Sequence, residues 1–367
     1  MRRRFLLAGM LVALTAAFIQ IPSAHGQTEA VHSADVRVSA SGISAPDTLP
    51  TGNVTLDIST DDPAGTWLVL VRLDPDTSLA GYLDNLRTAY GDDEEAALIA
   101  RREIAETVRM LGGAILSDTP ASVTMVLTPG VHHLVDIQDA TEPDLAERVR
   151  PVRVTPVRAD VAQQPAQQPA QQPAQAPALL TMVDTEHGPR YRVPDRLVTG
   201  RPIVMLNRGG QPYEAILMPV RPGTTPADLD EFFQGINGVR PAQAAPPFIG
   251  EGTGSAPLSP DRLMTFDADL PPGQYAIISW VEDLETGRIS SALGLHALVT
   301  LVDPAEPTPE AAATPAGEPV SPGVTATSSG RRGHLRHGRV AIRSSAPERI
   351  TAVGDQTYSR PTSTARV

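Results

Sequence analysis

The sequence predicts a mainly β protein with two tandem antiparallel β-sandwich domains, the first of which carries an added helix. Short apolar segments alternate with polar residues at the two-residue period of a strand and are separated by turns rich in Pro and Gly. Turn motifs of the first half recur in the same order in the second half, and a Gln/Pro/Ala-rich run separates the halves. The 367 residues suffice for two domains of ordinary size.

The N-terminal segment is typical of an export signal. Three arginines precede an apolar core at 5–21, and Ala24-His25-Gly26 offers the small residues of a cleavage site. We therefore expect a signal peptide over 1–26, a disordered lead over 27–35, and a secreted or cell-envelope location without a further membrane span. General secretory and twin-arginine export both stay open, as does retention of the signal as an anchor.

Residues 36–158 are expected to form the first domain. Apolar residues alternate over 54–58, and the nearly continuous apolar run 67–73 is typical of a strand buried on both faces. Residues 122–137 are interpreted as a β-hairpin around Thr-Pro-Gly, and 149–157 as a closing strand.

A helix is predicted over residues 92–111 of this domain. Its first turn is acidic, as the helix dipole favours, and Gly112-Gly113 is interpreted as its stop. Apolar residues recur at spacings of three and four along one face; they are Ala97, Ala100, Ile104, Val108 and Leu111. We expect this face, including Ile104, to pack against the first sandwich.

The second half repeats the pattern of the first. Residues 159–178 lack apolar periodicity and are expected to be a disordered linker. Residues 179–303 then contain Pro194-Asp195 and Thr199-Gly200 in the arrangement of Pro46-Asp47 and Thr51-Gly52, which indicates duplication. The tail, 304–367, is expected to be disordered and is basic at its end.

Composition excludes several classes of function. The chain has no Cys, which excludes disulfides, thiol nucleophiles and thiolate metal sites. Its net charge of -12 argues against a nucleic-acid partner, because neutralising phosphates requires a basic face. We expect an extracellular or envelope partner whose chemistry the sequence leaves unknown.

Motifs for catalysis and metal binding are also absent from the sequence. It contains no Gly-x-Ser-x-Gly, His-Glu-x-x-His, phosphate-binding loop or EF-hand. His132 and His133 are adjacent strand residues and should point to opposite faces, so they are not expected to share a metal. Asp61-Asp62 and the acidic run 92–95 are interpreted as a turn and a helix start rather than calcium sites. We expect no catalytic residue, no cofactor and no metal.

Both halves resemble cupredoxin domains, the β-sandwiches of plastocyanin and azurin. Residues 207–214 resemble the segment where these domains place a first histidine ligand, and Leu270-Pro-Pro-Gly-Gln-Tyr275 resembles their Pro-Gly-x-Tyr turn. Gly294-Leu295 resembles the Gly-Met that ends their copper loop. In the first half, Thr66 and Asp136 stand at the first two ligand places. An immunoglobulin-like sandwich stays open as an alternative.

The resemblance implies four ligand positions in the second half: Tyr213, Ser279, Ser290 and Leu295. The family has His, Cys, His and Met there, and a blue-copper site needs two imidazoles and a thiolate. We therefore expect a vestigial pocket without copper, in which the four residues cluster and the buried Ser279 hydroxyl has a hydrogen-bond partner.

The sequence favours a non-catalytic binding or structural module of unknown ligand, and we expect no enzyme. The alternative is a copper-handling or electron-transfer protein with unconventional ligands. A hydrolase would need a nucleophile and base that no sequence motif provides.

Overall fold

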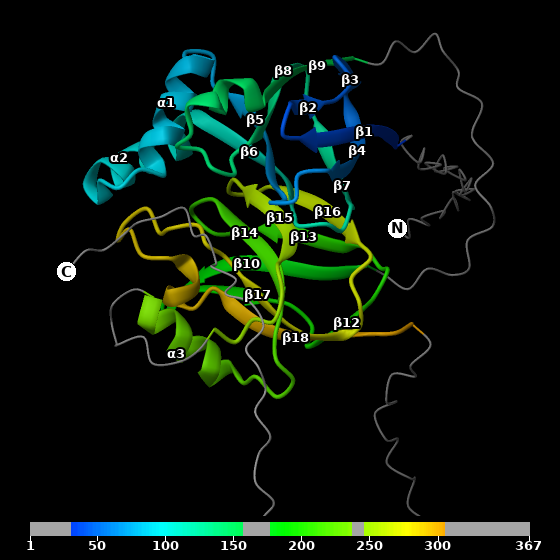
Figure 1. Cartoon of the computed structure of the whole chain (residues 1–367), viewed down its shortest axis with the longest axis vertical. Coiled ribbons are helices and arrows are strands. Elements are labelled where there is room, and N and C mark those ends of the chain that lie inside the picture. The colour runs from blue at the N-terminus through cyan, green and yellow to red at the C-terminus, as the bar shows by residue number, and fades with distance from the viewer. Residues whose placement is uncertain (1–30, 157–176, 237–245, 305–367) are drawn as a thin grey trace, which may run out of the picture.

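The computed structural model of the protein describes residues 31–156, 177–236 and 246–304. These residues form an eight-stranded and a ten-stranded β-sheet that pack face to face, with the helices outside the ten-stranded sheet (Figure 1). The prediction of a mainly β fold built from β-sandwiches is confirmed. Among the described residues, no helix has both the length and the apolar character that a bilayer span requires.

The first half of the chain contributes strands β1 to β9. They are β1 (His32–Ser39), β2 (Gly42–Ser44), β3 (Thr48–Pro50), β4 (Gly52–Thr60), β5 (Thr66–Leu73), β6 (Val108–Leu116), β7 (Ala121–Leu127), β8 (Gly130–Asp136) and β9 (Val149–Thr155). Helices α1 (Leu79–Ala89) and α2 (Glu94–Thr107) lie between β5 and β6, and the 3-10 helix η1 (Pro143–Arg148) precedes β9. Strand β1 begins inside the predicted disordered lead 27–35, because from His32 onward it pairs with β4.

The second half repeats this order of elements, with one helix in place of two. Its strands are β10 (Ala178–Thr185), β11 (Gly188–Arg192), β12 (Arg196–Val198), β13 (Ile203–Asn207), β14 (Tyr213–Pro219), β15 (Thr253–Leu258), β16 (Leu263–Ala268), β17 (Gly273–Ile278) and β18 (His296–Val302). Helix α3 (Pro226–Ile236) follows β14, and η2 (Ser290–Leu293) precedes β18. The predicted linker up to residue 176 and the tail from residue 305 lie outside the described residues.

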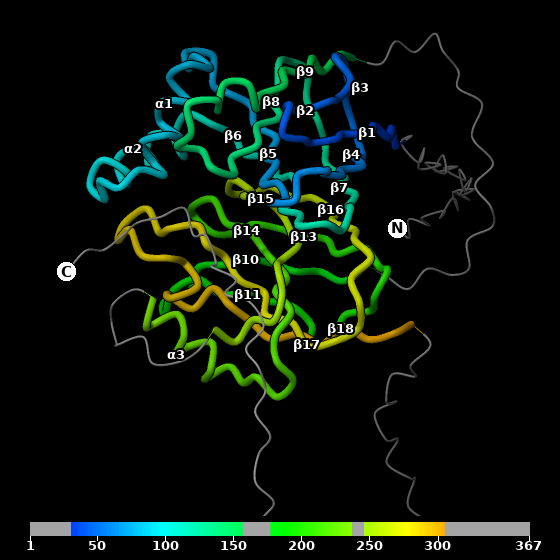
Figure 2. Tube along the Cα trace, viewed as in Figure 1, coloured from blue at the N-terminus to red at the C-terminus, as the bar shows by residue number. Residues whose placement is uncertain are grey.

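Both sheets continue from one half of the chain into the other. Strand β7 pairs with β16, with Met125 opposite Met264, and β6 pairs with β15, with Ala114 opposite Ser255. Figure 2 shows the trace of the first half lying over that of the second, with these four strands at the junction. Most strand pairs are antiparallel, and four are parallel: β1 with β4, β10 with β13, β3 with β9 and β12 with β18.

One hydrophobic core fills the space between the sheets across both halves. It contains Val54 and Leu68 of the first half together with Met205 and Phe266 of the second, all at most 1% exposed. The alternation predicted over 54–58 is present, since every second residue of β4 points into this core. Two smaller apolar clusters lie on the outer face of the ten-stranded sheet, under the helices.

The predicted helix 92–111 ends earlier than expected. Asp93 caps α2 by accepting a hydrogen bond from the Ala96 N–H at 3.0 Å, and Ile104 is buried as predicted. From Val108 the chain is strand β6, because its backbone pairs with β5 and this pairing outweighs the helical periodicity. Gly113 lies inside that strand with φ of 142°, and a Cβ there would meet the Leu68 carbonyl oxygen at 2.1 Å.

The predicted hairpin over 122–137 is also wrong. Strand β7 belongs to the eight-stranded sheet and β8 to the ten-stranded sheet, so the two strands do not pair with each other. The Thr-Pro-Gly segment carries the chain from one sheet to the other. A turn of this composition looks the same in sequence whether it joins partners in one sheet or crosses to the other.

Candidate functional site

The structure brings three of the four resemblance-derived residues into one hydrogen-bonded loop. The Ser291 hydroxyl accepts a hydrogen bond from the Ser279 N–H at 2.8 Å and lies 3.0 Å from the Leu295 carbonyl oxygen. The Leu295 N–H donates to the Ser290 carbonyl at 3.0 Å. The fourth residue, Tyr213, starts strand β14, and its hydroxyl donates to Asp184 at 2.8 Å. All four side chains are buried.

The donor atoms at this place do not fit a copper ion. The hydroxyls of Ser279 and Ser290 are buried and, in the described part of the chain, make no hydrogen bond, contrary to the expectation of a partner for Ser279. Neither an imidazole nor a thiolate stands at these positions, and cuprous copper binds those softer ligands. Among the described residues, no three His, Asp or Glu side chains come together in a way that could hold a metal.

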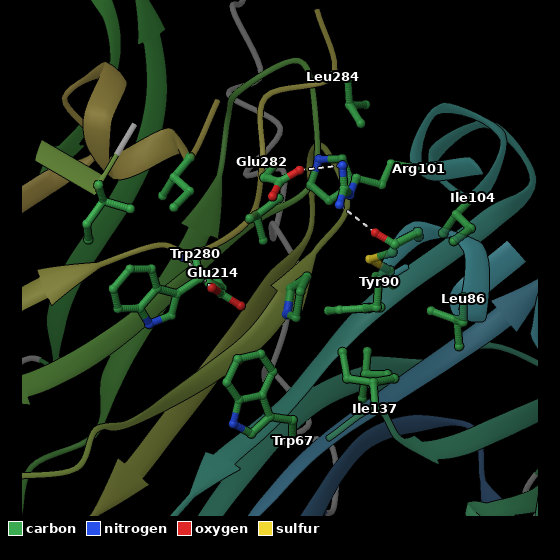
Figure 3. Close-up of a pocket in the computed structure, with 18 of the residues that line it drawn as sticks. Trp67, Leu86, Tyr90, Arg101, Ile104, Ile137, Glu214, Trp280, Glu282 and Leu284 are labelled. Carbon is green, nitrogen blue, oxygen red and sulfur yellow. Dashed lines mark hydrogen bonds and ion pairs between the residues drawn. The ribbon is translucent and has the colours of Figure 1, made fainter. Parts of the chain in front are cut away.

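A cavity of about 600 Å³ lies on the outer face of the ten-stranded sheet (Figure 3). Strands β5, β6, β14 and β15 form its base, at the junction between the two halves. Helices α1 and α2 provide one wall, while α3 and the loop between β17 and η2 provide the other. Each half therefore contributes one wall.

The aromatic residues of the chain are concentrated in this cavity. The whole sequence has only 2 Trp, 6 Tyr and 6 Phe, yet both tryptophans and four other aromatic side chains line this one space. They are Trp67, Tyr82, Tyr90, Phe232, Phe248 and Trp280. Edge-to-face contacts fix part of this wall, with Phe232 and Phe248 at 5.2 Å between ring centroids. Leucine and isoleucine side chains from α1, α2 and the loops fill the remaining wall.

Glu214 places a carboxyl group at the base of the cavity. It is the second residue of β14 and shares the outward face of that strand with Ile216 and Met218, so the strand period directs it toward the cavity. Its Oε1 atom accepts a hydrogen bond from the Trp280 N–H at 2.7 Å. The side chain is 3% exposed, and burial raises its pKa from 4.5 to about 7, although the Trp280 and Val281 N–H groups favour the ionised form.

An ion pair joins the two walls at the rim. Arg101 of α2 pairs with Glu282, which follows β17, and also donates to the Ala89 carbonyl (Figure 3). The neighbouring Arg102 donates to the backbone carbonyls of Leu284 at 2.6 Å and Glu285 at 3.2 Å. These contacts tie a helix of the first half to a loop of the second half, and they leave Arg101 and Glu282 balanced in charge.

Sequence reasoning missed this cavity. It placed Trp67 at the start of a predicted strand and included Glu214 only as the last residue of the motif at 207–214, and it did not predict α1. A usable signal was present in the sequence of β14, where Glu214 is a single acidic residue within an otherwise apolar strand. The scarcity of aromatic residues also made both tryptophans informative.

No protein-family model matches the chain, and no curated protein matches it either. Solved structures that are similar include reduced auracyanin from Roseiflexus castenholzii, at 15% identity over 34% of this chain and 94% of that one, with a TM-score of 0.20. A blue copper oxidase from Nitrosomonas europaea matches at 10% identity over 75% of this chain and 86% of that one, with a TM-score of 0.18. The copper nitrite reductase of the same organism matches at 10% identity over 74% and 94%, with a TM-score of 0.20.

These similarities correct one prediction from the sequence. Several of the similar structures are multicopper oxidases, and one is a nitrite reductase, which contradicts the expectation that the protein is not an enzyme. We do not maintain that expectation. With TM-scores of 0.18 to 0.20 and identities of 10 to 15%, these three similarities assign neither a family nor an activity to this chain.

Proposed function

We propose that this protein binds a small, largely apolar organic molecule in the cavity between its two halves. One observation carries the proposal: a space of about 600 Å³ gathers both tryptophans and four other aromatic side chains of an aromatic-poor chain. Ligand pockets are typically about 300–1,000 Å³, mostly apolar, with a few polar groups that orient the ligand. Glu214, Arg101 and Glu282 supply such polar groups here.

The size of the space supports a binding site over a packing defect. Protein interiors are close-packed, and voids larger than a water molecule are few. The two walls could close by a shift of α2 toward α3, which would bury the apolar lining. Instead, the Arg101–Glu282 ion pair and the Arg102 hydrogen bonds hold α2 against the β17–η2 loop, so the walls are braced around the space.

The proposal includes the location and the domain organisation predicted from the sequence. The export signal over 1–26 supports a secreted or cell-envelope location, and the resemblance supports tandem cupredoxin-like domains over 36–158 and 179–303. The hydroxyls and leucine at Ser279, Ser290 and Leu295 support a protein that does not use the copper position of that family. The ligand would then be met outside the cytoplasm, in a cavity whose lining does not include Ser279, Ser290 or Leu295.

Binding of a neutral apolar probe tests the proposal. N-Phenyl-1-naphthylamine, which is uncharged at pH 8, should bind with one site per chain, measured from its own fluorescence excited directly. Ile236→Trp places a bulky side chain in the cavity wall and should abolish binding. Ile99→Trp makes the same change at an exposed position of α2 outside the lining, and it should bind as wild type does. Equal binding by both variants, or none by the wild type, would refute the proposal.

A further inference from the structure

We infer that the ligand is a hydrophobic amine, whose cationic group lies against the Glu214 carboxylate beside the indole rings of Trp67 and Trp280. This inference rests on the proposed function and specifies the chemistry of its ligand. In Figure 3 the carboxylate of Glu214 points into the space that the two tryptophans flank. The charge, the aromatic surface and the apolar volume of the cavity each support it.

The charge balance of the lining favours a cation. Three acidic or basic side chains line the cavity, namely Glu214, Arg101 and Glu282, and the last two form an ion pair with each other. Glu214 has backbone N–H groups as partners, and these do not neutralise a negative charge. A ligand ammonium group would provide the missing opposite charge, whereas a ligand carboxylate would be repelled by it.

The aromatic surface favours the same group. A cation is attracted by the face of an aromatic ring, most strongly by that of Trp, and the attraction increases where water is excluded. Both tryptophans of the chain stand in the same lining as the buried carboxylate. An acidic group together with several aromatic rings is therefore suited to an ammonium ion, and the leucine and isoleucine side chains are suited to an apolar body.

The volume and position of the groups indicate how such a ligand would lie. Glu214 stands on the sheet at the base, whereas Arg101, Glu282 and Leu284 stand at the rim. The amine would thus point inward to the base, and the apolar part would extend along α1 and α2, against side chains such as Leu86 and Ile104. A molecule with one amine at the end of an aliphatic or aryl chain has this shape.

A matched series of ligands tests this inference. Octylamine, 1-octanol and octanoate share one chain and differ in the charge of the head group, and their affinities at pH 8 can be measured by displacement of N-phenyl-1-naphthylamine. We expect octylamine to bind about tenfold to a hundredfold more tightly than octanol, as a charge-assisted hydrogen bond provides, and octanoate to bind most weakly.

Glu214→Gln should remove most of the preference for the amine over the alcohol, whereas Glu106→Gln, the same change at an exposed position of α2, should keep it. Circular dichroism of each variant checks that it is folded. If octanol displaces the probe as well as octylamine does, or if octanoate binds best, the charge assignment is wrong and the cavity is still a ligand site. If the probe itself fails to bind the wild type, the proposed function is what fails.

Discussion

Replacing Glu214 by Gln should stabilise the folded protein at pH 8 but not at pH 4.5. The reason is the burial of a carboxyl group that is only 3% exposed. In the unfolded chain this group ionises near 4.5, whereas in the fold burial raises its pKa to about 7. Below pH 4.5 the group is protonated in both states, and the stability associated with the raised pKa is fully present. As the pH rises from 4.5 through 7, that stability is lost.

The size of the effect follows from the shift in pKa. A difference of one pKa unit corresponds to about 1.4 kcal/mol, so the shift from 4.5 to about 7 corresponds to a loss on the order of 3 kcal/mol in the free energy of unfolding. Glutamine has nearly the same shape and no charge, and its amide oxygen can still accept the hydrogen bond from the Trp280 N–H. The variant should therefore keep at pH 8 the stability that the wild type has only in acid.

Chemical denaturation at pH 4.5, 6 and 8 measures this difference, with unfolding followed by circular dichroism. The titratable groups that interact with Glu214, Tyr90 and Tyr191, are present in both proteins, so the variant isolates the contribution of Glu214. Glu106→Gln, at an exposed position, should change stability little at any of the three pH values. A Glu214→Gln protein that is no more stable than wild type at pH 8 would refute the reasoning.

Three further predictions concern the fold. Burial lowers the pKa of His132 from 6.5 to about 4, so the free energy of unfolding should fall as the pH drops from 6.5 towards 4. His132→Gln should reduce that fall in acid denaturation. An acid denaturation curve equal to that of wild type would contradict this. Ile104→Asp should cost several kcal/mol, about 3 or more, because it buries an unpaired charge under α2, and a melting temperature equal to that of wild type would show the face to be solvated. Cleavage of the chain within 159–176 should leave two fragments that co-elute in size-exclusion chromatography, since β6–β15 and β7–β16 hold the halves together, and separate elution would contradict the continuous sheets.

Local patterns predicted the parts of the fold that local interactions determine. The alternation over 54–58 and the apolar run 67–73 correspond to β4 and β5. These strands were predictable because the order of polar and apolar residues along a strand shows which of its faces are buried. The prediction from the sequence was wrong where pairing with a strand distant in the chain determines the local conformation. Gly112-Gly113 has the composition of a helix stop, but it forms part of β6 because β5 and β15 pair on either side of it.

The cavity could not be predicted for the same reason. Its walls come from α1, α2, α3 and the loop after β17, which are far apart in sequence and meet only through the junction of the two halves. The proximity of Ser279, Ser290 and Leu295 was easier to predict than the cavity, since these three residues lie within one short stretch of chain. Glu214 was visible in the sequence as a charge in an apolar strand, yet its role depends on Trp280 and on helices of the other half.

The continuous sheets also determine what the molecule exposes at its margins. A single half on its own would present the long strands β6 and β7, or β15 and β16, as free edges with unpaired backbone groups, and such edges recruit other chains. In the intact protein β6 pairs with β15 and β7 with β16, so none of these edges is free. The strands at the outer edges of the two sheets, β2, β3, β11 and β12, are only 3 to 5 residues long. Joining two equivalent units in one polypeptide thus provides the protection that a symmetric dimer of single units would otherwise have to provide by association, and it does so at any protein concentration.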